Sequence, residues 1–167
     1  AVFYLSEYGR KDPGLGADVQ KSLEFAGLIA FLEQNADLLA EICIAKSYAG
    51  FAVPEVWKQW LLRHTHRFKV GSDPVSGLYD DYHEFLMCNW MAASIGQEAF
   101  ARHLTPSRMC FQAMHVPPPL REISEHIYQM GSRRSADWTA MRPQIMAALS
   151  PDGQAVLSWA ENSSSHF

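Results

Sequence analysis

Apolar side chains recur every three or four residues from residue 17 onward, which is the spacing of one face of an α-helix. The preceding segment, residues 1–16, is rich in turn formers such as Gly9, Pro13 and Gly14, so we expect a loose N-terminal arm there. The apolar residues 2–5 leave an alternative open, in which the arm packs onto the body as a short strand or an anchor.

The apolar pattern predicts two helices over about 17–34 and 36–48. The second of them ends at Gly50, because glycine is the residue best suited to follow the last turn of a helix. A further helix is predicted to begin at Pro54, since proline lacks the N–H that residues in a first turn leave unbonded.

The longest predicted helix covers residues 78–104, and we expect it to form the centre of the fold. Gly96 within it allows either a bend or the close approach of a neighbouring helix. A short helix is predicted from Pro106 to Met114, and the three prolines at 117–119 then predict an extended connector.

Three more helical patterns complete the chain, the second capped by Ser135 and kinked or split at Pro143. No alternating pattern typical of a strand follows residue 16. The predicted fold class is therefore all-α, an irregular single-domain bundle of six to eight helices. The helical domain covers 17–161, between the arm at 1–16 and a flexible tail at 162–167.

The composition is that of a globular domain: 167 residues, 48% of them hydrophobic and 19% charged. Three cysteines lie far apart without the spacing of a zinc site, which favours a reducing compartment and a cytoplasmic location. No apolar run approaches the ~18–20 residues of a membrane span, and no basic segment typical of a signal peptide is visible. The net charge of −4 disfavours nonspecific binding of nucleic acid.

The densest polar cluster contains Asp80, Asp81 and Glu84, with Met87 and Met91 on the same flank of the predicted long helix. This flank is our candidate partner surface, because acidic groups steer association and methionines adapt to different partners. The alternative is that a neighbouring helix covers the flank and that the acids only balance the helix dipole. No catalytic motif is present, and aromatic residues are abundant. The leading hypothesis is therefore a non-enzymatic cytosolic protein–protein interaction module, such as an inhibitor, an adaptor, an immunity-type protein or a regulatory protein.

A second hypothesis is a helical-bundle enzyme that binds a metal or a cofactor. Its candidate ligands for a divalent metal are Asp80, His83, Glu84, Glu122 and His126, which include two pairs at helical spacing. Outside this hypothesis the sequence predicts no cofactor.

A third hypothesis is a nucleic-acid-binding regulator. Its candidate contacts are the basic residues Arg63, His66, Arg67 and Lys69, although basic residues at a helix end also favour the helix dipole.

Overall fold

The computed structural model describes residues 1–71, 80–100 and 109–163, and these ranges are mostly helical. They contain eight α-helices, a short 3-10 turn and a two-stranded sheet, which confirms the prediction of an all-α bundle. No helix in these ranges is long and apolar enough to cross a bilayer. In chain order the elements are α1 (Val2–Leu5), α2 (Ala17–Leu32), α3 (Ala36–Tyr48), α4 (Glu55–Thr65), β1 (Lys69–Gly71), α5 (Tyr82–Ser94), β2 (Cys110–Gln112), α6 (Pro119–Gln129), the 3-10 turn Gly131–Arg133, α7 (Trp138–Ala148) and α8 (Pro151–Ser163).

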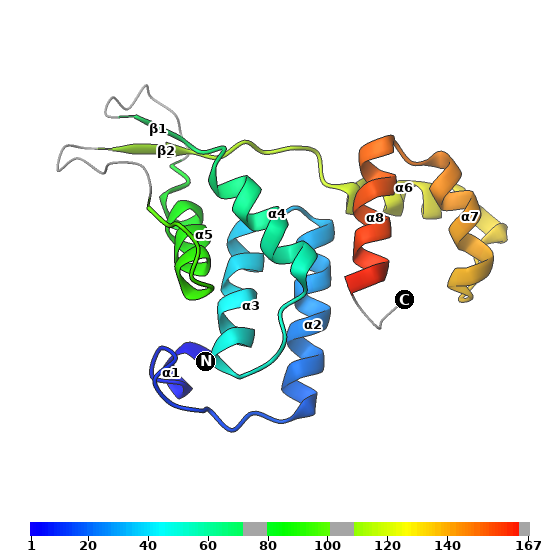
Figure 1. The fold of residues 1–167 in the computed structure, drawn as a ribbon. Helices are drawn as coiled ribbons and strands as arrows, with labels where there is room; N and C mark the ends of the chain where they lie inside the picture. The colour runs from blue at the N-terminus through cyan, green and yellow to red at the C-terminus, as the bar shows by residue number, and fades with distance from the viewer. Residues whose placement is uncertain (72–79, 101–108, 164–167) are drawn as a thin grey trace.

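Helix α3 forms the centre of the fold. The sequence pattern had instead predicted that the helix over residues 78–104 would take this position. Helix α3 packs against α1, α2, α4 and α5 (Figure 1). Its buried residues occupy most of its circumference, which is typical of a helix enclosed by others. They are Ala36, Leu39, Ala40, Ile42, Cys43, Ile44, Ala45 and Lys46.

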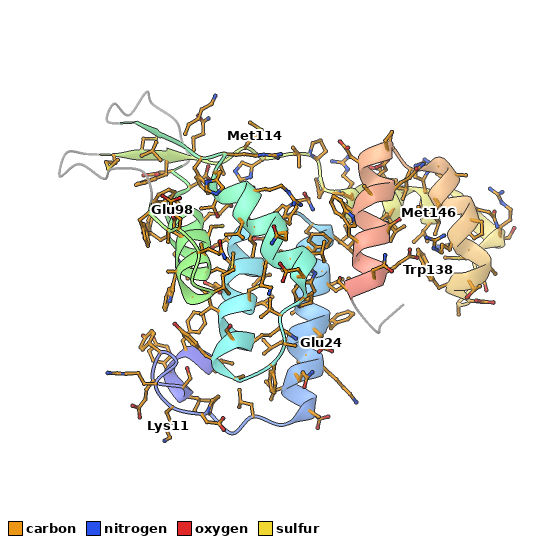
Figure 2. The ribbon with its side chains drawn as sticks, in the orientation of Figure 1. Lys11, Glu24, Glu98, Met114, Trp138 and Met146 are labelled. Carbon is orange, nitrogen blue, oxygen red and sulfur yellow. The ribbon has the colours of Figure 1, made fainter. Side chains whose placement is uncertain are left out.

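The C-terminal helices α6, α7 and α8 form a second group beside the larger one (Figure 1). Helix α8 contacts α2, α4 and α6, and the connector that carries Met114 joins the two groups along the chain (Figure 2). One continuous buried cluster includes Phe31 and Trp57 of the larger group and Ile145 and Leu157 of the second. The two groups therefore share a single hydrophobic core.

The predicted long helix over 78–104 is wrong in its bounds. Helix α5 begins at Tyr82 and ends at Ser94, and Gly96 adopts a left-handed conformation with φ of +71°. The N–H groups of Gly96 and Gln97 donate to carbonyls of the last turn, as at many helix ends that use glycine. Gly96 thus ends the helix, and residues 101–104 lie outside the described part of the chain.

The predictions of a helix over 106–114 and of no strand after residue 16 are also wrong. Residues 110–112 form β2, which pairs antiparallel with β1 in a register that places Phe111 opposite Val70. The Phe111 ring packs on Phe85, with centroids 4.6 Å apart. A three-residue strand is too short to show an alternating pattern, and contacts from distant residues fix its conformation. Residues 106–108 lie outside the described ranges.

The N-terminal segment packs onto the body, as the alternative for residues 2–5 supposed. Helix α1 places Phe3 against Tyr48 and Trp90, with ring centroids 6.0 and 5.4 Å away. Residues after α1 up to Gly16 contain no helix or strand. The arm is therefore anchored at its start by aromatic contacts.

Helix α7 differs from the sequence prediction at its cap and at its proline. Asp137 caps it by accepting hydrogen bonds from the N–H groups of Thr139 and Ala140, whereas Ser135 was expected in that role. Pro143 lies inside an unbroken helix and does not split it. The proline removes the N–H that would bond to the carbonyl of Thr139 one turn back, and its ring crowds that carbonyl. A kink, the other outcome expected there, stays a prediction.

Replacing Gly27 tests the close packing of α2 against α4. A Cβ at Gly27 would overlap the fully buried indole of Trp57. We expect Gly27→Ala to lower the free energy of unfolding by about 1–3 kcal/mol because of overpacking, although alanine is the better helix former by about 1 kcal/mol. Urea denaturation measures the change, and Ser22→Ala on the exposed side of the same helix is the control. A Gly27→Ala protein more stable than wild type would contradict this packing.

A charged cluster joins α7 to α8. Arg142 donates to the Glu161 carboxylate from Nε and Nη2, at 2.7 and 2.8 Å, and Trp138 Nε1 donates to it at 2.9 Å. The hydrogen bonds from Arg142, followed by the one from Trp138, lower the pKa of Glu161 although its burial acts in the opposite direction.

The lowered pKa of Glu161 makes this cluster sensitive to acid. A carboxyl with a depressed folded-state pKa stabilises the fold above its unfolded-state pKa, and this contribution disappears as the pH falls through the folded-state pKa. We expect Glu161→Gln to unfold more easily than wild type at neutral pH, with the two proteins converging in acid. Thermal melts followed by circular dichroism across this pH range measure the difference. A constant difference at all pH values would exclude the carboxylate charge as its cause.

Candidate functional site

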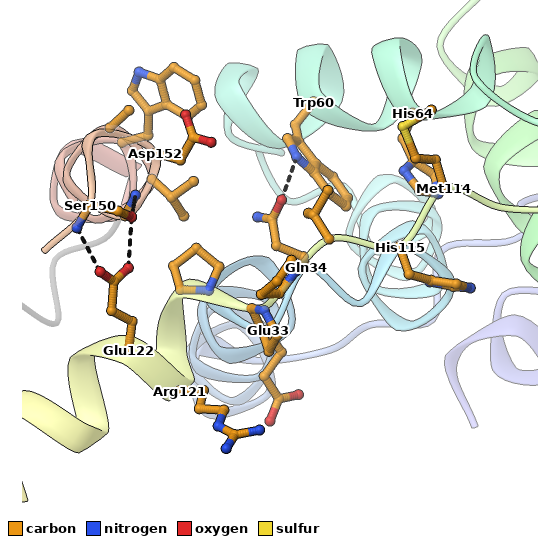
Figure 3. A pocket seen from close by; sticks show the side chains of 18 of the residues that line it. Glu33, Gln34, Trp60, His64, Met114, His115, Arg121, Glu122, Ser150 and Asp152 are labelled. Carbon is orange, nitrogen blue, oxygen red and sulfur yellow. Dashed lines mark hydrogen bonds between the residues drawn. The ribbon is translucent and has the colours of Figure 1, made fainter.

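An open cleft of about 870 Å³ lies between the two helix groups. One wall comes from α4 and the end of α2, the opposite wall comes from α6 and α8, and the connector over residues 114–118 runs along it (Figure 3). A cleft of this size is within the range of about 300–1,000 Å³ that is usual for ligand pockets.

The connector is extended because of its prolines. Pro118 has φ of −71° and ψ of 130°, a conformation close to polyproline II, and Pro119 is buried as the first residue of α6. Met114 and Val116 precede the prolines and remain 51% and 49% exposed while lining the cleft. The connector therefore places apolar side chains along the cleft, and these side chains remain accessible to solvent.

The α4 wall is formed by residues at helical spacing, namely Trp60, Arg63, His64 and Arg67 just beyond the end of the helix. Trp60 is held by a hydrogen bond from its Nε1 to Gln34 Oε1 at 3.1 Å (Figure 3). The guanidinium of Arg63 lies 6.0 Å from the ring centroid of Trp159 on α8, a cation–π contact between the two walls. Both arginines are exposed.

His64 is the buried polar residue of this wall and is only 8% exposed. Its Nε2 lies 2.6 Å from Glu84 Oε1, and because an ionised carboxylate only accepts, Nε2 donates. The ring stacks on Trp60 at 5.3 Å and meets the edge of Phe68 at 5.4 Å. Glu84 therefore satisfies a histidine that the aromatic contacts hold in place.

A histidine oriented by a carboxylate can serve as a general base when a nucleophile lies next to it. The adjacent hydroxyl, Thr65 Oγ1, instead donates to the Leu61 carbonyl at 2.7 Å. The contact between His64 and Glu84 joins α4, which lines the cleft, to α5.

The acidic groups of the opposite wall are largely satisfied by neighbours. Glu122 accepts hydrogen bonds from the N–H and the hydroxyl of Ser150 at 2.6 and 2.8 Å, which ties α6 to the start of α8 (Figure 3). Arg121 pairs with Glu125 one turn away. Asp152 of α8 also lines the cleft on this side, whereas Glu33 at the end of α2 belongs to the other wall. The basic groups of that other wall are Arg63 and Arg67.

The predicted partner surface on α5 is only partly exposed. Met87 and Met91 are 6% and 0% exposed and belong to the core, so they cannot form part of an exposed surface. Asp80 and Asp81 accept hydrogen bonds from the N–H groups of Phe111 and Ala113, at 3.0 and 2.7 Å. These acids lie outside α5 and hold β2. Of the predicted partner surface, the two methionines are therefore wrong, whereas Asp80 is exposed and stays a candidate.

The five predicted metal ligands do not meet at one site, because their side chains have separate partners. His83 bonds to Asp37, Glu84 to His64 and Glu122 to Ser150. Asp80 accepts from the backbone of β2, and His126 lines a different depression beside α7. His83 does lie in a group that could hold a metal, but with ligands from α3.

The predicted nucleic-acid contacts are divided between two places. Arg63 and Arg67 line the cleft, whereas Lys69 begins β1. The sequence pattern identified Arg63 and Arg67 as basic but did not select Trp60 and His64. The spacing of these two aromatic rings along one helix was the available signal, and it could not show that they lie beside a cleft.

Together these features define an all-α protein with an open cleft that is aromatic and basic on one side and bounded by an extended proline connector. The chain belongs to the family described as Domain of unknown function (DUF6902), which matches it over residues 1–167. No curated protein and no solved structure matches the chain.

Replacing Glu84 tests the support of the α4 wall. Glu84→Ala leaves the buried His64 without its acceptor, so we expect a loss of about 1–3 kcal/mol in the free energy of unfolding. Glu84→Gln retains an acceptor oxygen and should cost less. Chemical denaturation measures both variants, with the exposed Glu98→Ala as the control. Equal stabilities for Glu84→Ala and the control would show that the contact to His64 contributes nothing.

Proposed function

We propose that this protein is a non-enzymatic interaction module that binds an extended, acidic segment of a partner protein in the cleft between α4 and α8. The observation that carries the proposal is the juxtaposition of exposed apolar side chains and two arginines along one open cleft. Inhibitor, adaptor, immunity-type and regulatory roles all use binding of this kind.

The apolar part of the cleft supports binding of a polypeptide. Met114, Val116 and Trp159 are 51%, 49% and 40% exposed. Tryptophan is enriched among residues that dominate binding energy, and methionine adapts its shape to different side chains. An extended segment of a partner would cover these groups and remove their apolar surface from water.

The charge of the α4 wall favours an acidic occupant. Arg63 lies in the last turn of α4 and Arg67 lies just beyond its end, and a guanidinium can bind a carboxylate through two parallel hydrogen bonds. The chain as a whole carries a net charge of −4. An acidic segment is therefore attracted to Arg63 and Arg67 more than to the rest of the surface, which directs it to the cleft. An interface between two folded domains usually buries about 1,200–2,000 Å², whereas a cleft suits a single segment.

A cytoplasmic location is part of the same proposal. All three cysteines are free, and burial raises the pKa of the Cys43 thiol to about 12. Free thiols are usual in reducing compartments, and a buried thiol of raised pKa is unreactive.

The proposal is tested by reversing the charge of the α4 wall. The immobilised wild-type protein and an Arg63→Glu, Arg67→Glu variant are used to capture proteins from the native host, with quantitative mass spectrometry as the readout. The partner should be retained by wild type and reduced by at least about tenfold with the variant, as expected when a charge pair worth about 1.4 kcal/mol or more is lost. A Trp159→Ala variant should also lose it.

The matched control is Lys11→Glu, Lys21→Glu, which reverses the same amount of charge at exposed positions on the N-terminal segment and α2. This control should retain the partner. Equal retention by the cleft variants and the control would reject the cleft as the binding site. Recovery of nucleic acid in place of a protein, lost in the arginine variant, would support the nucleic-acid hypothesis instead.

A further inference from the structure

Asp37, Glu41 and His83 bring three potential metal ligands together where α3 meets α5. Each residue offers one ligand atom within 4.8 Å of the other two. The Nδ1 atom of His83 lies 2.9 and 3.0 Å from the two carboxylate oxygens of Asp37. Ligands around a tetrahedral zinc ion, each bonded at about 2.0–2.1 Å, lie about 3.3 Å apart. Only small side-chain movements are therefore needed to admit an ion.

The backbone that carries these ligands is well supported. Asp37 and Glu41 lie one turn apart at the start of α3, whose first turn is capped by the Asn35 side chain accepting from the N–H of Leu38. His83 lies in the first turn of α5, which packs along α3. Ligands on two packed helices keep their spacing better than ligands on loops.

The electrostatic arrangement favours a cation. Two carboxylates one turn apart on a helix repel each other. His83 contacts Asp37, whereas within the described ranges Glu41 makes no hydrogen bond or ion pair. Besides the dominant effect of burial, the charges of Glu84 and Asp37 raise the pKa of the nearby Cys88 thiol. A divalent ion between the carboxylates would offset this concentration of negative charge.

We propose that Asp37, Glu41 and His83 bind one divalent transition-metal ion, with Zn²⁺ as the preferred ion. One imidazole nitrogen and two carboxylate oxygens form a donor set that suits zinc, and among common divalent metals zinc is bound strongly. The side chains of His83 and Asp37 are 53% and 37% exposed, which gives the ion an entry path and leaves a fourth position for water. The buried Cys88 remains outside the ligand set.

This site retains His83 from the sequence analysis and replaces its other predicted ligands with residues of α3. It does not rest on the proposed binding function, because none of its three ligands lines the cleft. Metal binding and partner binding can therefore succeed or fail separately.

The test uses the full chain freed of metal by a chelator and dialysis. Isothermal titration with Zn²⁺ should show one saturable site per chain, and Co²⁺ should give the visible absorption of a low-symmetry site. His83→Ala should weaken Zn²⁺ binding by about 100-fold or more, since even partners outside the first ligand shell contribute about 10–100-fold. Zn²⁺ should raise the melting temperature of wild type and leave that of His83→Ala unchanged.

The matched control is His126→Ala, which removes a half-buried histidine from α6 and should bind Zn²⁺ like wild type. If His83→Ala fails to fold, Glu41→Gln carries the test, because it keeps the side-chain volume and removes only a ligand charge. Unchanged affinity in the His83 or Glu41 variant would overturn the site. Weak uptake of several ions without saturation would overturn it as well.

Discussion

The structure depends on the burial of α3. This helix has no continuous polar face, so α2, α4 and α5 must surround it, and the crossing of these helices leaves little free space. At Gly27 of α2, the indole of Trp57 occupies the volume that a side chain would take. The other helices are positioned so that they enclose α3. Exposing its apolar surface to water would cost more free energy than any contact on the protein surface contributes.

Helix α4 serves both the core and the cleft. Trp57 and Leu61 are fully buried against the central helices, while Trp60 and Arg63 lie on the side that meets α8. His64 lies between these two sides and is satisfied by Glu84 of α5. The site is therefore rigid on its α4 side because the residues that line it belong to a helix held by the core.

The parts of the fold that could be predicted are the helices with long, regular patterns, among them α2, α3, α6 and α8. The sheet could not, because Asp80 and Asp81 hold β2 through hydrogen bonds between residues about thirty positions apart. The end of α5 depends on a left-handed Gly96, a conformation that glycine permits but does not require. For the candidate sites, the sequence identified Arg63, Arg67 and His83 as residues able to bind a ligand. It did not show that Arg63 contacts Trp159 or that His83 contacts Asp37.

The sequence by itself determined that the chain is helical, because apolar residues recur with the period of a helix. It also determined that no reactive motif is present along the chain. Only the tertiary structure decided which polar residues meet, such as His64 with Glu84 and His83 with Asp37. Such contacts join residues of different helices, and helix packing angles depend on the whole set of side chains at each interface. The location of the cleft follows from that packing, and the local pattern of apolar and polar residues does not predict it.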